Sequence, residues 1–444
     1  MTFDTIGLHV PHILLPNPSI DLTRWSVIAC DQYTSQPEYW EEVSSFVGDS
    51  PSTLNLILPE VYLDSPDEQE RIDRINRCML EYIQKAILVP QKPGFILTDR
   101  KTVNAGSRKG LIVALDLERY EYTEGSHTLI RATEGTIINR LHPRIRIRKN
   151  APLEIPHILV LIDDPEKTVI EPLFTGNLKK VYDFDLMKNG GHLTGRHIDD
   201  ETIIQRIAHN LERLADPDFF SERYSVADEG VLLYAMGDGN HSFATAKALW
   251  ETIKADAQDT TAIMNHPARY ALVELVNLHD DGLVFTPIHR VVFNCNVNHM
   301  IGRMQSFFTD AGSEFSFIKP SQSEVAPENG AYSERSHTIP FITKEGYGSI
   351  VIQHPSYLLA VESLQAFLDE YLADTEGVVI DYIHGRETVH SLASQPDTVG
   401  FFLPPIAKND LFKTVILNGA LPRKAFSLGE AEEKRFYLES RKII

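Results

Sequence analysis

The stretch VLLYAMGDGNHSFATAKALWE (231–251) constrains the fold more than any other part of the chain. Its first six residues are apolar and predict a buried strand, whereas the residues from His241 onwards predict a helix. One tight turn, Gly-Asp-Gly-Asn, joins the two. Segments 157–164 and 268–278 also predict strands, and segments 67–88 and 199–215 predict helices. Strands that alternate with helices indicate an α/β chain with a mixed sheet.

The chain is too long for one ordinary hydrophobic core, with 444 residues. The polar segment KPSQSEVAPENGAYSERSHT (319–338) is the best candidate for a linker. We therefore expect an α/β core over residues 1–318, a linker-like loop over 319–338 and a smaller α/β segment over 339–444. The end of the chain, from about residue 396, is expected to return to the core.

The overall charge argues against two classes of partner. With 42 basic and 62 acidic residues the formal net charge is −20, so the surface should repel nucleic acid and anionic membranes. No apolar run approaches the roughly 18 residues that span a bilayer. The N-terminal segment lacks a basic region and a cleavage site of a secretory signal, and the three cysteines lie far apart. These features predict a cytoplasmic protein that binds neither nucleic acid nor membrane.

The backbone of the turn at 237–242 has the features of an anion site. The first amide groups of a helix have no partner within the helix, and the positive end of the helix dipole attracts anions. Gly237 and Gly239 permit a positive φ and the close approach of an oxygen atom. The turn, including Asn240, is therefore predicted to bind phosphate.

The side chains of the turn indicate which chemistry would accompany a phosphate. Asp238 would repel a bare phosphate, so it suits a Mg²⁺ ligand or a proton acceptor for an attacking hydroxyl. His241 is a candidate donor to a phosphate oxygen, and the hydroxyls of Ser242 and Thr245 are further candidates. In the alternative interpretation, Asp238 or Asn240 only caps the helix and the glycines relieve strain in the turn.

Residues 131–149 form a basic segment with six arginine or lysine residues and the single acid Glu134. Arginine suits phosphate because its planar group donates two hydrogen bonds at once. Arg131 and Glu134, with Thr133 between them, are the candidates for a functional pair. The Arg-Ile alternation at 144–148, taken as a strand, would place its arginines on one face and suits architecture or an interface. The alternative for the whole segment is a strand with a solvated basic face.

Three other places are candidates for ligand contacts. The alternatives without a function are, in the order given below, capping of a strand end, simple turn chemistry and solvated charges. The residues of the three places are the pair His289 and Arg290 for phosphate, Asp31 after a predicted strand at 24–30 for substrate, and the loop residues Arg423 and Lys424 for substrate.

Five segments resemble a bacterial and archaeal family catalogued as a domain of unknown function with serial number 1015. They are CDQYTSQPEYW (30–40), RATEGT (131–136), MGDGNHSFATAK (236–247), RYALVELVNLHDDGLVFTPIHR (269–290) and LPRKAFSLGEA (421–431). They cover most of the chain in order. Much of the family has Asp-Gly-His-His-Arg where this chain has Asp-Gly-Asn-His-Ser at 238–242, so the first histidine and the arginine are replaced here.

The Asp-Gly-His-His-Arg turn also resembles that of the ParB/sulfiredoxin-like superfamily, which includes free-serine kinases. This resemblance implies a core of that kind with large insertions, in which the turn and its helix hold nucleotide phosphates and Mg²⁺. It makes Asp238 the metal-binding or catalytic carboxylate, His241 a phosphate contact and Glu134 a second acid. Because Ser242 replaces the arginine, Arg131 or Arg290 would have to supply the lost phosphate contact.

Together these observations predict a Mg²⁺-dependent kinase that acts on a small hydroxylated metabolite such as free serine. The phosphate donor would be a nucleotide (ATP or ADP) or another phosphoanhydride such as pyrophosphate, and a homodimer is one expectation. One alternative is a nucleotide-binding switch of the ParB type that hydrolyses its ligand slowly. The other is a protein that binds a phosphorylated metabolite without catalysis.

Overall fold

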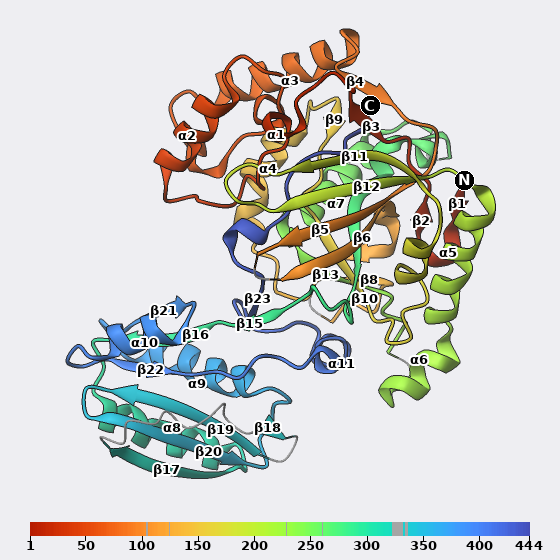
Figure 1. The fold of residues 1–444 in the computed structure, drawn as a ribbon. Coiled ribbons are helices and arrows are strands. Elements are labelled where there is room, and N and C mark those ends of the chain that lie inside the picture. Colours follow the sequence, from red (N-terminus) through yellow and green to blue (C-terminus); the bar gives the residue numbers. More distant parts are fainter. Residues whose placement is uncertain (104, 124, 228, 260, 322–331, 334–335) are drawn as a thin grey trace. The chain divides into compact units, whose positions relative to one another are not determined.

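The computed structural model describes residues 1–444 except 104, 124, 228, 260, 322–331 and 334–335, and Figure 1 shows its ribbon. The chain forms two units. The first comprises Met1–Val284, Val415–Ala420 and Leu428–Ile444, and the second comprises Phe285–Thr414 and Leu421–Ser427. The division thus falls near residue 284 and not at the expected loop 319–338, most of which lies outside the described residues. Residues 428–444 return to the first unit.

The first unit is built on an 11-stranded sheet. In order along the sheet, its main path contains β11 (Lys179–Asp185), β12 (His192–Ile198), β5 (Phe95–Thr102), β6 (Gly106–Asp116), β14 (Tyr270–Asn277), β10 (Leu159–Ile162), β13 (Tyr234–Asp238), β8 (Ile130–Arg131) and β7 (Tyr120–Glu121), with β1 (Thr2–Phe3) and β2 (Leu8–His9) off this path. The pairs β10–β14, β13–β8 and β7–β8 are parallel, whereas pairs such as β5–β6 and β10–β13 are antiparallel. The expected mixed α/β class is confirmed.

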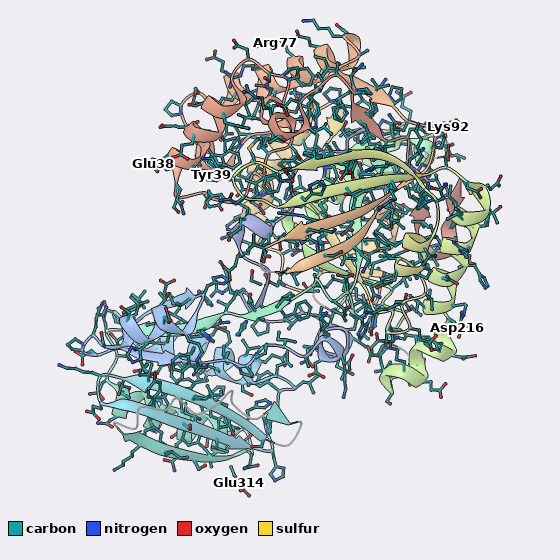
Figure 2. All side chains as sticks on the ribbon, viewed as in Figure 1. Glu38, Tyr39, Arg77, Lys92, Asp216 and Glu314 are labelled. Atoms are coloured by element: carbon teal, nitrogen blue, oxygen red, sulfur yellow. The ribbon has the colours of Figure 1, made fainter. Side chains whose placement is uncertain are left out.

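The central strand β6 contributes to a hydrophobic core on each face of this sheet. Leu111 and Val113 join the core that contains residues of α5 (Glu201–Leu214) and α7 (Asn240–Asp256). Ile112 joins the core that contains residues of α2 (Pro37–Val47) and α3 (Glu68–Gln84). Because successive side chains of a strand point to opposite faces, helices cover the sheet from both sides. The charged side chains of Glu38 on α2 and Arg77 on α3 lie on the outside (Figure 2).

The first unit contains several shorter elements beside the sheet and these helices. They are α1 (Leu22–Trp25), α4 (Leu141–Arg148), α6 (Pro217–Tyr224), β3 (Leu14–Pro16), β4 (Leu88–Pro90), β9 (Leu153–Glu154) and β24 (Arg441–Lys442). Within the described part of the chain, no helix has both the length and the apolar character needed to cross a bilayer.

Two predicted strands are wrong. In segment 24–30, Trp25 ends the short helix α1, and Ile28 forms only an isolated bridge with Phe436. Trp25, Val27 and Ile28 are all buried. The apolar pattern of this segment therefore indicates burial and not an extended strand. Segment 144–148 belongs to helix α4.

The second unit contains a seven-stranded antiparallel sheet. Its elements are α8 (Val297–Asp310), α9 (Ala360–Asp374), α10 (Arg386–Ala393), β15 (Phe285–Pro287), β16 (His289–Phe293), β17 (Glu314–Ser321), β18 (Tyr332–Ser333), β19 (Ser336–Thr343), β20 (Gly346–Gln353), β21 (Val379–Ile383) and β22 (Val399–Phe401). Strands β17 and β19 both pair with β20, so the two sides of the expected linker lie in one sheet. Two elements, α11 (Lys408–Asn418) and β23 (Phe426–Leu428), contain residues of both units.

Candidate functional site

The turn between β13 and α7 is held by Gly239, which is the N-cap residue of the helix. Gly239 has φ of 74°, a left-handed conformation that favours glycine. A Cβ atom there would lie 3.0 Å from the Cα of Ile158, so the backbone of the neighbouring segment also excludes a side chain. The strand therefore enters the helix through a turn whose conformation and close packing both require glycine.

Neither Asp238 nor Asn240 caps the helix, so the capping role of the alternative interpretation is wrong, whereas its strain-relieving role for glycine holds at Gly239. No side chain caps α7, because Asp238 Oδ1 accepts a hydrogen bond from the amide of Gly239, which precedes the first turn. Among the residues that the structure describes, no atom accepts a hydrogen bond from the amides of Asn240 and His241. Two donors at the positive end of a helix are thus available to an anion.

Asp238 faces a cation that the sequence does not point to. Lys434 Nζ lies 3.1 Å from Asp238 Oδ2, and the two side chains are 15% and 29% exposed. Burial by itself would raise the pKa of Asp238, but the charge and hydrogen bond of Lys434 outweigh burial and lower this pKa. Asp238 is therefore a carboxylate at neutral pH. Lys434 adds a positive charge beside the open amides of the turn.

A second group of polar residues, around His157, lies next to the turn. His157 Nε2 and Ser242 Oγ are 2.9 Å apart, and His157 Nδ1 and the hydroxyl of Tyr437 are also 2.9 Å apart. Asp31 Oδ2 lies 3.9 Å from His157 Nε2. Burial raises the pKa of Tyr437, so its hydroxyl stays protonated and holds the imidazole ring from the side remote from Ser242. The structure thus brings the predicted residues Asp31 and Ser242 together through a histidine.

His241 lies in the same region but is not a cation at neutral pH. Burial, together with the nearby Arg144 and Arg140, lowers its pKa to about 4. Its Nε2 atom accepts a hydrogen bond from the amide of Ile137, at 3.3 Å. A contact between His241 and a phosphate would therefore be a neutral hydrogen bond and not an ion pair.

Several other predicted residues support the backbone of the turn. Asn240 Nδ2 donates to the carbonyl of Glu134 at 3.1 Å, and Thr133 Oγ1 donates to the carbonyl of Met236 at 2.6 Å. Thr245 Oγ1 donates to the carbonyl of His241 at 2.7 Å. These contacts use the side chains of Asn240, Thr133 and Thr245 to fix the main chain on which the open amides lie.

Arg131 is buried, with 2% of its surface exposed, and its guanidinium group points to main-chain carbonyls. It donates to the carbonyls of Thr128, Glu229 and Gly230 at 2.9, 2.8 and 2.7 Å. These bonds are typical of an arginine that organises loops. They do not supply the phosphate contact that replacement of the family arginine by Ser242 would require.

The arginines of 144–148 pair with acids and do not form a basic face. On helix α4, Arg144 pairs with Glu60, and Arg146 lies 2.7 Å from Glu68. Arg148 lies 2.5 Å from Glu154, which is buried. The pairs with Glu60 and Glu68 tie α4 to a distant segment of the first unit, and the pair with Glu154 ties it to the following strand β9, in agreement with the architectural role expected for the alternation.

The remaining predicted residues, His289, Arg290, Arg423 and Lys424, belong to the second unit. Arg290 is fully buried, donates to Gln365 Oε1 at 2.9 Å and lies over the ring of Tyr382. Burial and the charge of Arg386 lower the pKa of His289 to about 4. The Nδ1 atom of His289 accepts a hydrogen bond from the amide of Leu403. Arg290 and His289 thus make structural contacts within their own unit.

The acidic residues near the turn fit Mg²⁺ only if phosphate oxygens complete its ligands. Over the described residues, no group of three or more His, Cys, Asp or Glu side chains is arranged to hold a metal by itself. Mg²⁺ at nucleotide sites is typically bound by one or two carboxylates together with phosphate oxygens and water. Asp238 and Asp31 both interact with His157 and supply two such carboxylates.

A pocket of about 130 Å³ opens beside these groups. His157, Ser242, Thr245 and Tyr437 line one part of it, and apolar side chains line most of the rest. The candidate site therefore combines open amides, an aspartate–lysine pair, a serine–histidine contact and an apolar recess.

Comparison with known proteins places the chain in a family. A family model described as a protein of unknown function, DUF1015, matches residues 14–371. No curated protein matches the sequence.

Three solved structures illustrate the similarity found in structural comparison. A free serine kinase in complex with AMP is 11% identical, with a TM-score of 0.36 over 74% of this chain and 88% of that one. A conserved hypothetical protein from Pyrococcus furiosus is 12% identical, with a TM-score of 0.35 over 74% of this chain and 90% of that one. C-terminally truncated SbnI from Staphylococcus aureus is 10% identical, with a TM-score of 0.33 over 71% of this chain and 81% of that one.

Proposed function

We propose that this chain, which belongs to the DUF1015 family, is a Mg²⁺-dependent phosphotransferase that moves a phosphoryl group from a nucleotide to a small hydroxylated metabolite. One observation carries the proposal: the unbonded amides of Asn240 and His241 at the start of α7 lie next to the Asp238–Lys434 pair. Phosphoryl transfer needs little covalent chemistry from a protein and depends on positioning and charge, and the amides with the adjacent ion pair support a role of this kind.

The phosphate groups of the nucleotide would lie at the start of α7. The amides of Asn240 and His241 would donate to phosphate oxygens, and the Lys434 ammonium would neutralise part of their charge. In this proposal Lys434 provides the cation that the arginine of the family motif would otherwise supply.

Asp238 and Asp31 would hold Mg²⁺ together with the phosphates. The ion, when bound, would neutralise charge that develops on the transferring group. Both carboxylates are partly exposed, at 29% and 26%, so a hydrated ion can reach them. Ser242, which lies 2.9 Å from His157 Nε2, would orient the acceptor hydroxyl, and Asp31 would take its proton on the carboxylate oxygen that does not bind the ion.

The test combines nucleotide binding with turnover. A titration of ADP and ATP with Mg²⁺ should raise the melting temperature of the protein, since a ligand that binds only the folded state stabilises it. Asp238→Asn should lower phosphate transfer by about 100-fold or more, the scale of losing one charge-stabilising group at an active site.

Asp200→Asn is a matched control. Asp200 caps α5 in the same unit by accepting the amides of Thr202 and Ile203, and asparagine caps helices as well as aspartate does. The control changes charge equally and should retain activity. Wild-type turnover in Asp238→Asn would refute the proposal, and nucleotide hydrolysis that no acceptor accelerates would favour the nucleotide switch instead.

A further inference from the structure

The pocket beside Ser242 has an apolar lining drawn from distant parts of the first unit. Its walls include Leu56, Leu58, Met79, Ile147, Leu153 and Leu272. These residues come from the segment before α3, from α3 itself, from α4, from β9 and from β14. Leu56, Leu58, Met79, Leu153 and Leu272 are buried and belong to the core on the α2–α3 face of the sheet. The recess is therefore an opening into a hydrophobic core.

The charged residues that line the pocket compensate one another. Arg144 pairs with Glu60, and Arg148 pairs with Glu154 at 2.5 Å. Both arginines of the lining are therefore engaged by carboxylates, and Glu154 is shared with a third arginine, Arg441, which lies outside the lining. A charged group that entered the pocket would lose its hydration and would have to compete for a carboxylate or guanidinium group that is already paired.

Polar groups are concentrated where the pocket meets the turn. Ser242 Oγ and His157 Nε2, 2.9 Å apart, both line it, and Tyr437 holds the other nitrogen of the histidine. A ligand that fills the recess with an apolar group would therefore present a hydroxyl at this end, next to the residues assigned above to phosphoryl transfer.

We propose that the recess binds the uncharged apolar part of the acceptor, so that the acceptor is a hydroxyl compound with a branched aliphatic or phenyl-sized group and not free serine. A protein cavity of about 150 Å³ holds benzene, so the volume of about 130 Å³ here suits a group of about four to six non-hydrogen atoms. The identity of this ligand as the acceptor rests on the proposed function, whereas the binding of the apolar alcohol does not.

The experiment measures the binding of simple alcohols to the whole protein without nucleotide or Mg²⁺. The probes are ethanol, 1-propanol, 1-butanol, 3-methylbutan-1-ol, benzyl alcohol and 1-octanol, with L-serine for comparison, followed by ligand-observed NMR. Affinity should rise roughly fourfold for each methylene that enters the recess, the factor that corresponds to burying one such group. It should be greatest for 3-methylbutan-1-ol or benzyl alcohol and should fall for 1-octanol.

Two variants locate the binding in the recess. Ala151 is buried and lines the pocket. The larger side chain of Ala151→Leu should fill part of the recess and reduce the affinity for 3-methylbutan-1-ol at least tenfold. Ala255→Leu makes the same change at an exposed position of α7 and should bind like the wild type. Should Ala151→Leu fail to fold, Met79→Ala widens the recess and should shift the preference towards a longer alcohol.

Affinity that does not depend on chain length, or wild-type binding by both pocket variants, would overturn the inference. Alcohol binding with the expected length dependence but without phosphate transfer would refute the proposed function and leave the apolar site intact. Phosphate transfer to L-serine with a kcat/KM equal to that for the apolar alcohols would refute the assignment of the acceptor and leave the proposed function intact.

Discussion

Replacement of Lys434 by methionine tests the electrostatic arrangement of the turn most directly. Methionine keeps an unbranched side chain of similar length and removes the charge together with its hydrogen bond to Asp238. At 3.1 Å, in the effective dielectric of about 20 that suits such sites, the attraction to Asp238 is about 5 kcal/mol. Desolvation of the two partly buried groups offsets much of this energy. We expect the variant to lose about 1–3 kcal/mol of unfolding free energy at pH 7.5.

The pH dependence of this loss follows from the pKa of Asp238. In the wild type Lys434 lowers this pKa, so the stability contribution is present above the pKa of the unfolded chain and is lost as pH falls through the lower folded pKa. Without Lys434, only the charge of His157 and the hydrogen bond from the Gly239 amide oppose burial, which then raises the pKa of Asp238. The folded variant then takes up a proton as pH falls through the raised value, which stabilises it. Its deficit relative to the wild type should therefore shrink between pH 7.5 and pH 5.

The assay is urea unfolding followed by tryptophan fluorescence. All three tryptophans, Trp25, Trp40 and Trp250, lie in the first unit, so the signal reports that unit alone. Asp238→Asn and the double variant complete a cycle, in which Asp238→Asn should restore stability to Lys434→Met. A deficit that is equal at both pH values, or losses that simply add in the double variant, would contradict the reasoning.

Three further predictions concern the turn and its support. Gly239→Ala should destabilise the first unit by about 2 kcal/mol in the same fluorescence assay, because Gly239 has a φ of 74° and lies against the backbone of Ile158. The control Gly135→Ala should have little effect, because open space surrounds Gly135. Arg131→Met should lower unfolding free energy by about 2–4 kcal/mol, since three carbonyls lose a charged donor, while Mg²⁺-ADP affinity measured by calorimetry stays unchanged. The ring protons of His241 should titrate near pH 4 by NMR, and wild-type stability relative to His241→Gln should fall as pH drops from about 6.5 towards that value, because the unfolded chain binds the proton more tightly.

The sequence predicts those helices and strands whose apolar residues recur with a regular period within one continuous segment. The helix at 67–88 and the strand–turn–helix at 231–256 have a clear period, and α3, β13 and α7 form there. The alternation at 144–148 misleads because its isoleucines and arginines fit a strand and are also accommodated on a helix. The helix is stabilised by pairing of Arg144 and Arg146 with Glu60 and Glu68, which come from another part of the chain.

The candidate site likewise has one part that the sequence predicts and another part that it does not. The turn with Asp238 is visible in the sequence because a strand, glycines and a helix follow one another. Lys434 and Tyr437 carry no such signal, since each is one polar residue within an irregular segment. Tyr437 reaches His157 across 280 residues of sequence, and only the folded sheet places them together. His157 is the first residue of the strand predicted at 157–164, which is its only sequence signal. In the structure it lies two residues before β10, whose first residue pairs with the end of the antiparallel strand β13.

Because residues 428–444 belong to the first unit but are synthesised last, the first unit cannot be completed until translation ends. Every residue of the second unit is synthesised before Lys434, so during translation Asp238 remains without its cation and His157 without Tyr437. A polypeptide released early, within residues 285–427, would have the strand–turn–helix but an unbalanced carboxylate inside it. Ligand binding would then distinguish finished chains from interrupted ones.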